Sequence, residues 1–249
     1  MKCTSALTFG ACWVRPFNWG MKAIIHVLIF FGALQAYFFG LLLLFKRSRK
    51  SYEWWLLILM LCLGTMQLLH FSRWEGYLEL YSPHLLRVRF LFPALIGPSF
   101  YLFSKAINGY KQSRALIWIC FIPAFINLAL ILPYLLQPSE IKLAKQLKEL
   151  YPINYYLIYT IARASVLIFA FLSWKSILIE SKSLRWLKKI SFILIIHSVI
   201  LILINVIDFL IYEIVSYYYI NLANTVLIFV LGFFTIRYGK VYYDVENED

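Results

Sequence analysis

The fold is decided by a long apolar run at residues 187–212, which reads LKKISFILIIHSVILILINVIDFLIY. Between positions 192 and 204 nearly every residue is apolar, whereas a strand of a transmembrane barrel alternates apolar and polar residues. About 20 apolar residues in a helix cross the hydrocarbon layer of a bilayer. Because backbone groups in lipid must be paired within the segment, this run predicts a membrane-spanning helix.

Six further runs of this kind occur along the chain. The 249 residues are 62% hydrophobic and 14% charged, with a mean hydropathy of +0.75, which excludes an ordinary soluble domain. We therefore expect an all-α polytopic membrane protein, a seven-transmembrane-helix bundle within residues 23–238. The predicted spans are residues 23–45, 54–71, 85–103, 115–136, 153–174, 187–212 and 217–236.

Basic residues set the expected orientation. Of the 24 Lys and Arg residues, most lie after the first, third, fifth and seventh spans, so the positive-inside rule places the N-terminus outside and the acidic tail 239–249 in the cytoplasm. The net charge of +12 therefore predicts contact with lipid headgroups and no direct nucleic-acid binding.

Residues 1–22 form an N-terminal extension, and translation from Met21 is a hypothesis that intact-mass measurement tests. The longest connection, 137–152, has helical apolar spacing and is expected on the membrane surface.

Arg163 is the most informative single residue. It lies about 15 Å along the fifth span from its outer start, near the bilayer midplane, where a charge costs at least about 2.5–3.5 kcal/mol unless it is paired or hydrated. His197, Asn205 and Asp208 fall within an arc of about 80° on the sixth span and are its expected partners. Two interpretations stay open: a polar centre that binds a ligand or switches packing, and an Arg–Asp pair that fixes helix register.

The seventh span also has a polar face. It includes Asn221 and Asn224, beside Tyr217 and Thr225. Together with Gln35 and Gln67, these residues either line a pocket with the polar centre or form interhelical hydrogen bonds.

Sequence motifs for metal binding or catalysis are missing. His26, His70 and His84 map near the outer boundary without the spacing of a helical metal site. The cysteines are scattered with no CxxC pair, and no GxSxG or Walker sequence occurs. We expect no metal, no cofactor and no enzymatic activity.

Proline and glycine residues predict bent helices. Each proline inside a helix removes a backbone donor and crowds the carbonyl four residues back, so kinks are expected in the third and fourth spans. The positions concerned are Pro93, Gly97, Pro98, Pro123 and Pro133.

Three segments carry a family resemblance. They are FGALQ at 31–35, followed by an apolar run that ends at Lys46-Arg47; FPALIGPSFYL at 92–102, after SPHL at 82–85; and FIPAF at 121–125, running on to LPY at 132–134. In this order they resemble the N-terminal seven-helix membrane domain of AraC-type transcriptional regulators from Bacteroidetes-like bacteria, over residues 21–243. The resemblance implies a sensory domain in the bacterial cytoplasmic membrane, followed by a helix-turn-helix domain that binds DNA.

No helix-turn-helix is present here, so DNA binding is not carried over. The sequence leads us to expect a sensory or signalling membrane domain without its output domain: a stand-alone form, a truncated gene product or a partner of a separately encoded cytoplasmic output protein. Its expected partners are the lipid bilayer, that output protein and a small ligand of unknown identity. The alternatives are a small-solute transporter or intramembrane enzyme, and a membrane anchor or assembly protein.

Overall fold

A computed structural model describes residues 19–45, 50–74, 88–144, 152–177, 185–211 and 217–239, with Gly76, Tyr81 and Leu85 and without the side chains at several helix ends. This part of the chain is helical, in agreement with the predicted all-α class. Its elements are α1 (Trp19–Phe45), α2 (Ser51–Trp74), the 3-10 turn η2 (Val88–Phe90), α4 (Phe92–Ile107), α5 (Arg114–Leu135), α6 (Ser139–Ala144), α8 (Pro152–Ser176), α9 (Arg185–Ile211) and α10 (Tyr217–Gly239).

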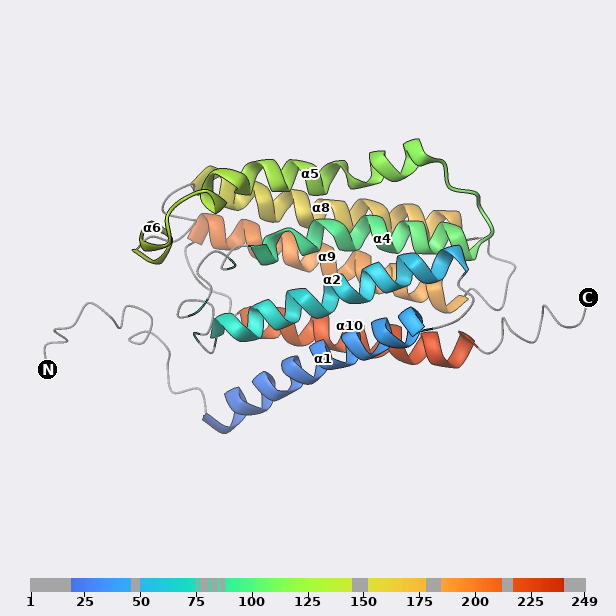
Figure 1. Cartoon of the computed structure of the whole chain (residues 1–249), viewed down its shortest axis with the longest axis horizontal. Coiled ribbons are helices and arrows are strands. Elements are labelled where there is room, and N and C mark those ends of the chain that lie inside the picture. Colours follow the sequence, from blue (N-terminus) through green and yellow to red (C-terminus); the bar gives the residue numbers. More distant parts are fainter. Residues whose placement is uncertain are drawn as a thin grey trace, which may run out of the picture.

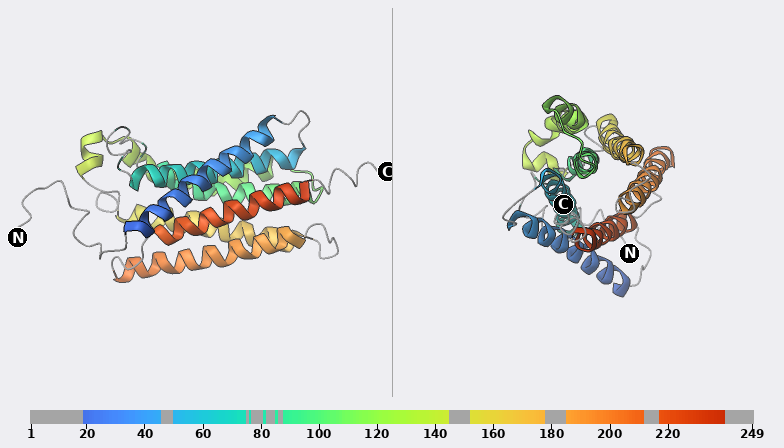
Figure 2. Two further views of the ribbon diagram at one scale, coloured as in Figure 1. Left: turned by 90° about the horizontal axis from the view of Figure 1, so that it is seen from below. Right: turned by 90° about the vertical axis from the view of Figure 1, so that its right-hand side faces the viewer.

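The long helices run along a common direction as an up-and-down bundle (Figures 1 and 2). Six stretches are long and apolar enough to cross a membrane, those of α1, α2, η2 with α4, α5, α8 and α9, which supports a multi-pass membrane protein. The described apolar stretch of α10, Leu222–Phe234, is shorter. Most of the extension 1–22, nearly all of the tail 239–249 and the side chains of Asp208 and Asn221 lie outside the described residues.

The surface of the bundle is apolar where a soluble protein would be polar. Only 17% of the apolar stretch of α5 is buried inside the protein, and large apolar side chains such as Trp118, Phe125 and Leu132 are exposed. Comparable rows of exposed apolar residues occur on α1 and α9. An exposed apolar surface of this extent requires lipid or a partner to cover it.

Helix α4 lies in the interior, between α2, α5 and α8 (Figure 2). A Cβ atom at Gly97 would lie 2.9 Å from both the Ser165 carbonyl oxygen and the Val166 Cα atom, so the α4 and α8 backbones touch there. The Ser165 hydroxyl also donates to the Ala94 carbonyl at 3.5 Å. Small residues at a crossing allow this close approach of membrane helices, and Gly97 therefore has a packing role.

The third predicted span begins later than expected. The sequence placed its start at residue 85, but α4 begins at Phe92, after η2. Pro93 lies in the first turn of α4, where a proline fits well because its missing N–H has no helical partner there. The predicted kink at Pro93 is therefore wrong, whereas Pro98, Pro123 and Pro133 do lie inside helices and their kinks stay predictions.

A lysine on α6 forms a hydrogen bond with the C-terminal end of α5. Lys142 is 3% exposed, and its Nζ donates to the carbonyl of Leu135, the last residue of α5, at 2.6 Å. The ammonium also lies 5.9 Å from the centre of the Tyr134 ring. A lysine that bonds a terminal helix carbonyl satisfies an acceptor that the helix itself leaves open. Burial lowers the pKa of Lys142.

Candidate functional site

Four basic residues lie on four elements that pack together in the bundle, and we call them the basic centre. It consists of His70 on α2, Arg89 on η2, Arg163 on α8 and His197 on α9. Arg89 is 6% and Arg163 8% exposed. Arg89 contacts His70 directly, and α8, which carries Arg163, packs against α9, which carries His197. Segments far apart in the sequence therefore bring these basic residues onto neighbouring elements.

Arg89 and His70 form the best-defined contact of the basic centre. The Arg89 Nη1 atom lies 3.1 Å from the His70 Nδ1 atom. Because a guanidinium group can only donate, Nδ1 must accept, which makes His70 a neutral imidazole with its proton on Nε2. The Arg89 guanidinium also lies 4.9 Å from the centre of the Phe90 ring, and Phe90 packs on Tyr159 with the ring centres 4.9 Å apart.

Arg163 lies deeper than this contact, about halfway along α8. Among the described residues, no hydrogen bond or ion pair engages its guanidinium, and Tyr159 lies one turn earlier on the same helix. The Nε2 atom of His197 is buried without a hydrogen-bond partner in the described chain. The Arg163 guanidinium on α8 and the His197 Nε2 atom on α9 therefore have no hydrogen bond to the described part of the chain.

The predicted partners of Arg163 separate into three groups. His197 lies on α9, which packs against the helix of Arg163, and its Nε2 atom has no hydrogen-bond partner in the described chain. Asn205 instead donates to the Thr160 hydroxyl at 3.2 Å, and so joins α9 to α8 one turn away. The Asp208 side chain lies outside the described residues. An Arg163–Asp208 pair is thus a prediction that the described chain leaves untested.

A second polar group joins α10 to α2, about one helical turn from His70. The Gln67 Nε2 atom on α2 donates to the Thr225 hydroxyl on α10 at 2.7 Å. The side chain of Asn224 is buried, and its Nδ2 atom has no partner within the described part of the chain, as is true of Gln35 Oε1. Gln67 and Thr225 thus act as an interhelical hydrogen bond, while Asn224 adds an unsatisfied donor.

Sequence reasoning missed the roles of His70 and Arg89. His70 was grouped with interfacial histidines and Arg89 with loop charges, but both belong to the basic centre. A signal was present in the flanking residues, because Arg89 stands between Val88 and Phe90 in a stretch that continues into α4. In the part of the chain that the structure describes, no three His, Cys, Asp or Glu side chains are grouped as metal ligands.

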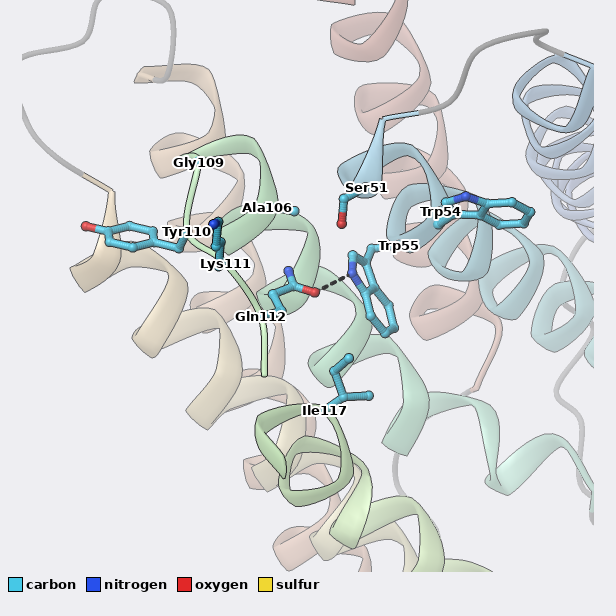
Figure 3. A pocket seen from close by; sticks show the side chains of 9 residues that line it. All are labelled: Ser51, Trp54, Trp55, Ala106, Gly109, Tyr110, Lys111, Gln112 and Ile117. Carbon is cyan, nitrogen blue, oxygen red and sulfur yellow. Dashed lines mark hydrogen bonds between the residues drawn. The ribbon is translucent and has the colours of Figure 1, made fainter. Parts of the chain in front are cut away.

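An open cavity of about 610 Å³ lies at the opposite end of the bundle, between the start of α2 and the loop from α4 to α5 (Figure 3). Gln112 shapes it: its Oε1 accepts from Trp55 Nε1 at 2.6 Å, and its Nε2 donates to the Leu102 carbonyl at 2.6 Å. The remaining lining residues are Ser51, Trp54, Ala106, Gly109, Tyr110, Lys111 and Ile117. Aromatic residues and a lysine at this level are typical of a membrane–water interface.

No family model, no curated protein and no solved structure matches this chain.

Proposed function

We propose that the chain is a sensory domain of the bacterial cytoplasmic membrane, with seven spanning helices, an outer N-terminus and a cytoplasmic C-terminus, and that a stimulus acts at the basic centre. The observation that carries the proposal is Arg163, which is 8% exposed in the middle of α8 and has no hydrogen bond or ion pair to another described residue. The resemblance to the membrane domain of AraC-type regulators supports a sensory role.

The free-energy cost of burying an arginine in a membrane favours a functional role for Arg163. A guanidinium at the bilayer centre costs several kcal/mol, and intramembrane charges usually mark ligand, ion or proton sites. A residue kept only for packing would be expected to use its five donors on neighbouring groups. Arg163 instead has no hydrogen bond or ion pair to another side chain in the described part of the bundle. The arrangement therefore suits a group whose surroundings change when the stimulus arrives.

A signalling assay tests the sensory role. The full chain is expressed in a bacterial host with a candidate output protein and a transcriptional reporter. The reporter should respond to the stimulus, and Arg163→Gln should abolish the response while the protein stays in the membrane. Arg114→Gln removes the same charge at the exposed start of α5 and serves as the matched control. An unchanged reporter response in Arg163→Gln would exclude the basic centre as the sensing site.

Cysteine labelling tests the proposed topology. In a cysteine-free background, Lys111→Cys at the cavity end should react with a membrane-impermeant maleimide only after the cells are opened. Ile141→Cys on α6, at the other end, should react in intact spheroplasts. Labelling of both positions from the same side would contradict the proposed orientation.

A further inference from the structure

We infer that the open cavity between α2 and the loop from α4 to α5 binds the headgroup of an anionic phospholipid, of the class of phosphatidylglycerol, with the Lys111 ammonium as the partner of the phosphate (Figure 3). The cavity lies at the opposite end of α2 from His70, so this site is separate from the proposed sensing site. Three features of the cavity support a lipid: the charge of its lining, the fixed shape of its loop and the apolar surface that continues from it.

The lining of the cavity is positively charged. Lys111 is one of the lining residues, and no Asp or Glu lines the cavity in the part of the chain that the structure describes. Two more basic residues flank it, Lys105 in the last turn of α4 and Arg114 at the start of α5. The carboxylate of Glu53, nearby in sequence, is buried and accepts from the Lys50 backbone N–H at 3.0 Å. A negatively charged ligand is therefore favoured in the cavity.

Hydrogen bonds hold the loop from α4 to α5 in one shape. Carbonyl groups in the last turns of α4 accept from the residues that follow: Ser104 from Asn108, Lys105 from Tyr110, Ala106 from Gly109 and Leu102 from Gln112. Gly109 has a φ of +78°, which a glycine adopts without strain. A preformed site loses less free energy to ordering when its ligand binds. Because these carbonyl oxygens are already used, the loop also favours an anion over a cation.

An apolar surface continues from the cavity along α5. Ile117 lines the cavity, and Phe121, one turn further along the helix, stacks on the Trp55 ring with the ring centres 6.1 Å apart. Next to them on α5, Trp118 and Ile122 are exposed. An acyl chain can lie on this surface while the headgroup of the same molecule occupies the cavity, whereas a free phosphate contacts only the polar end. The surface therefore favours a phospholipid over a soluble phosphate.

The size of the cavity and its aromatic lining agree with a lipid headgroup. Its volume of about 610 Å³ lies within the range of sites that hold small molecules. Trp54, Trp55 and Tyr110 line it, and such residues are enriched at the level of the headgroups. Lysine residues near the cytoplasmic membrane surface attract anionic lipids. Lys111 thus combines with aromatic neighbours at the depth where a phosphate lies.

Native mass spectrometry of the purified full chain tests the site. The probes are phosphatidylglycerol and the zwitterionic phosphatidylcholine, each added to delipidated protein in a non-ionic detergent. Phosphatidylglycerol should bind more tightly, and Lys111→Gln should weaken its binding roughly fivefold without changing that of phosphatidylcholine. Lys175→Gln is the matched control, because Lys175 is exposed near the end of α8, at the same end of the bundle (Figure 1). Equal affinities for the two lipids, or equal losses in the two variants, would overturn the inference.

A filled cavity provides the second measurement. Ala106 and Ser51 lie on facing sides of the cavity (Figure 3), and Ala106→Phe should weaken phosphatidylglycerol binding without a change of charge. If Ala106→Phe does not fold, Ser51→Phe at the exposed start of α2 replaces it. Unchanged binding in the folded variant would contradict the cavity as the site. Inorganic phosphate, at concentrations comparable to the lipid, should not displace it; displacement would assign the cavity to a soluble anion and reject the lipid.

Discussion

The Arg89 guanidinium lies 3.1 Å from the His70 imidazole, a contact that joins η2 to the last two turns of α2 and fixes the neutral tautomer of the ring. Removing the acceptor should destabilise the protein, since a charged donor that loses its partner costs about 1.5–3 kcal/mol. We expect His70→Ala to lower the free energy of unfolding by this amount in detergent. His70→Asn, whose amide oxygen can accept, should lose less. Equal losses in the two variants would show that the hydrogen bond is not the cause.

Gly97 should not tolerate a side chain. A Cβ atom there would lie 2.9 Å from backbone atoms of α8, which cannot rotate away. Overpacking of this kind costs about 1–3 kcal/mol, so Gly97→Ala should lower the unfolding temperature and Gly97→Val should lower it further. Gly40→Ala is the control, because its Cβ would meet the Leu61 side chain at 3.3 Å. A control variant as unstable as Gly97→Ala would contradict the argument.

The Gln67–Thr225 hydrogen bond should be modest in energy. Interhelical hydrogen bonds in membranes contribute about 0.6 kcal/mol on average and at most about 1.7 kcal/mol. A double-mutant cycle with Gln67→Leu and Thr225→Val should give a coupling free energy in this range. A coupling free energy of zero would mean that the contact at 2.7 Å contributes nothing net.

Gln112 should be more sensitive than Lys111, its neighbour in the cavity loop. Gln112→Leu removes both the acceptor for Trp55 and the donor for the Leu102 carbonyl, with an expected loss of about 1–3 kcal/mol. Gln112→Glu keeps the acceptor alone and should be intermediate. Lys111→Gln, at an exposed position, should stay within about 0.5 kcal/mol of the wild type. Limited proteolysis of the loop from α4 to α5 provides the second measurement.

Lys142 should make stability depend on alkaline pH. Its folded-state pKa lies below the ordinary value of 10.5 because burial disfavours the charged form. Between the folded and unfolded pKa values the unfolded chain binds more protons, so stability rises with pH through that window and is lower below it. Lys142→Met should remove this rise in the unfolding temperature. A rise of the same size in both proteins would assign it to other groups.

The spanning helices could be predicted from the sequence because long apolar runs have one solution in lipid. The run around residues 192–204 became α9, and the other runs became helices whose ends lie within a few residues of the prediction, the start of α4 excepted. The start of α4 was misplaced because hydropathy carries no information about backbone conformation. Residues 85–91 are apolar enough to extend a span, yet the helix begins just before Pro93.

Side-chain roles were less predictable. Helical spacing predicted that the connection 137–152 lies on the membrane surface, but it did not indicate that Lys142 is buried, with its amine bonded to the end of α5. Arg163 was identified by the cost of its burial. Its neighbours His70 and Arg89 depend on how three helices and η2 cross, and a one-dimensional charge pattern does not contain that information.

The contact between Gly97 and Ser165 also has a mechanical consequence. Ser165 follows Arg163 by less than one helical turn, so a displacement of α8 at the basic centre would push directly on the α4 backbone. Helix α4 begins two residues after η2 and extends about 24 Å along its axis to Ile107, five residues beyond Leu102, whose carbonyl accepts from the Gln112 amide. It thus connects the level of Arg89 with the level of the aromatic cavity, and a movement at the Gly97–Ser165 contact would reach both ends of the bundle.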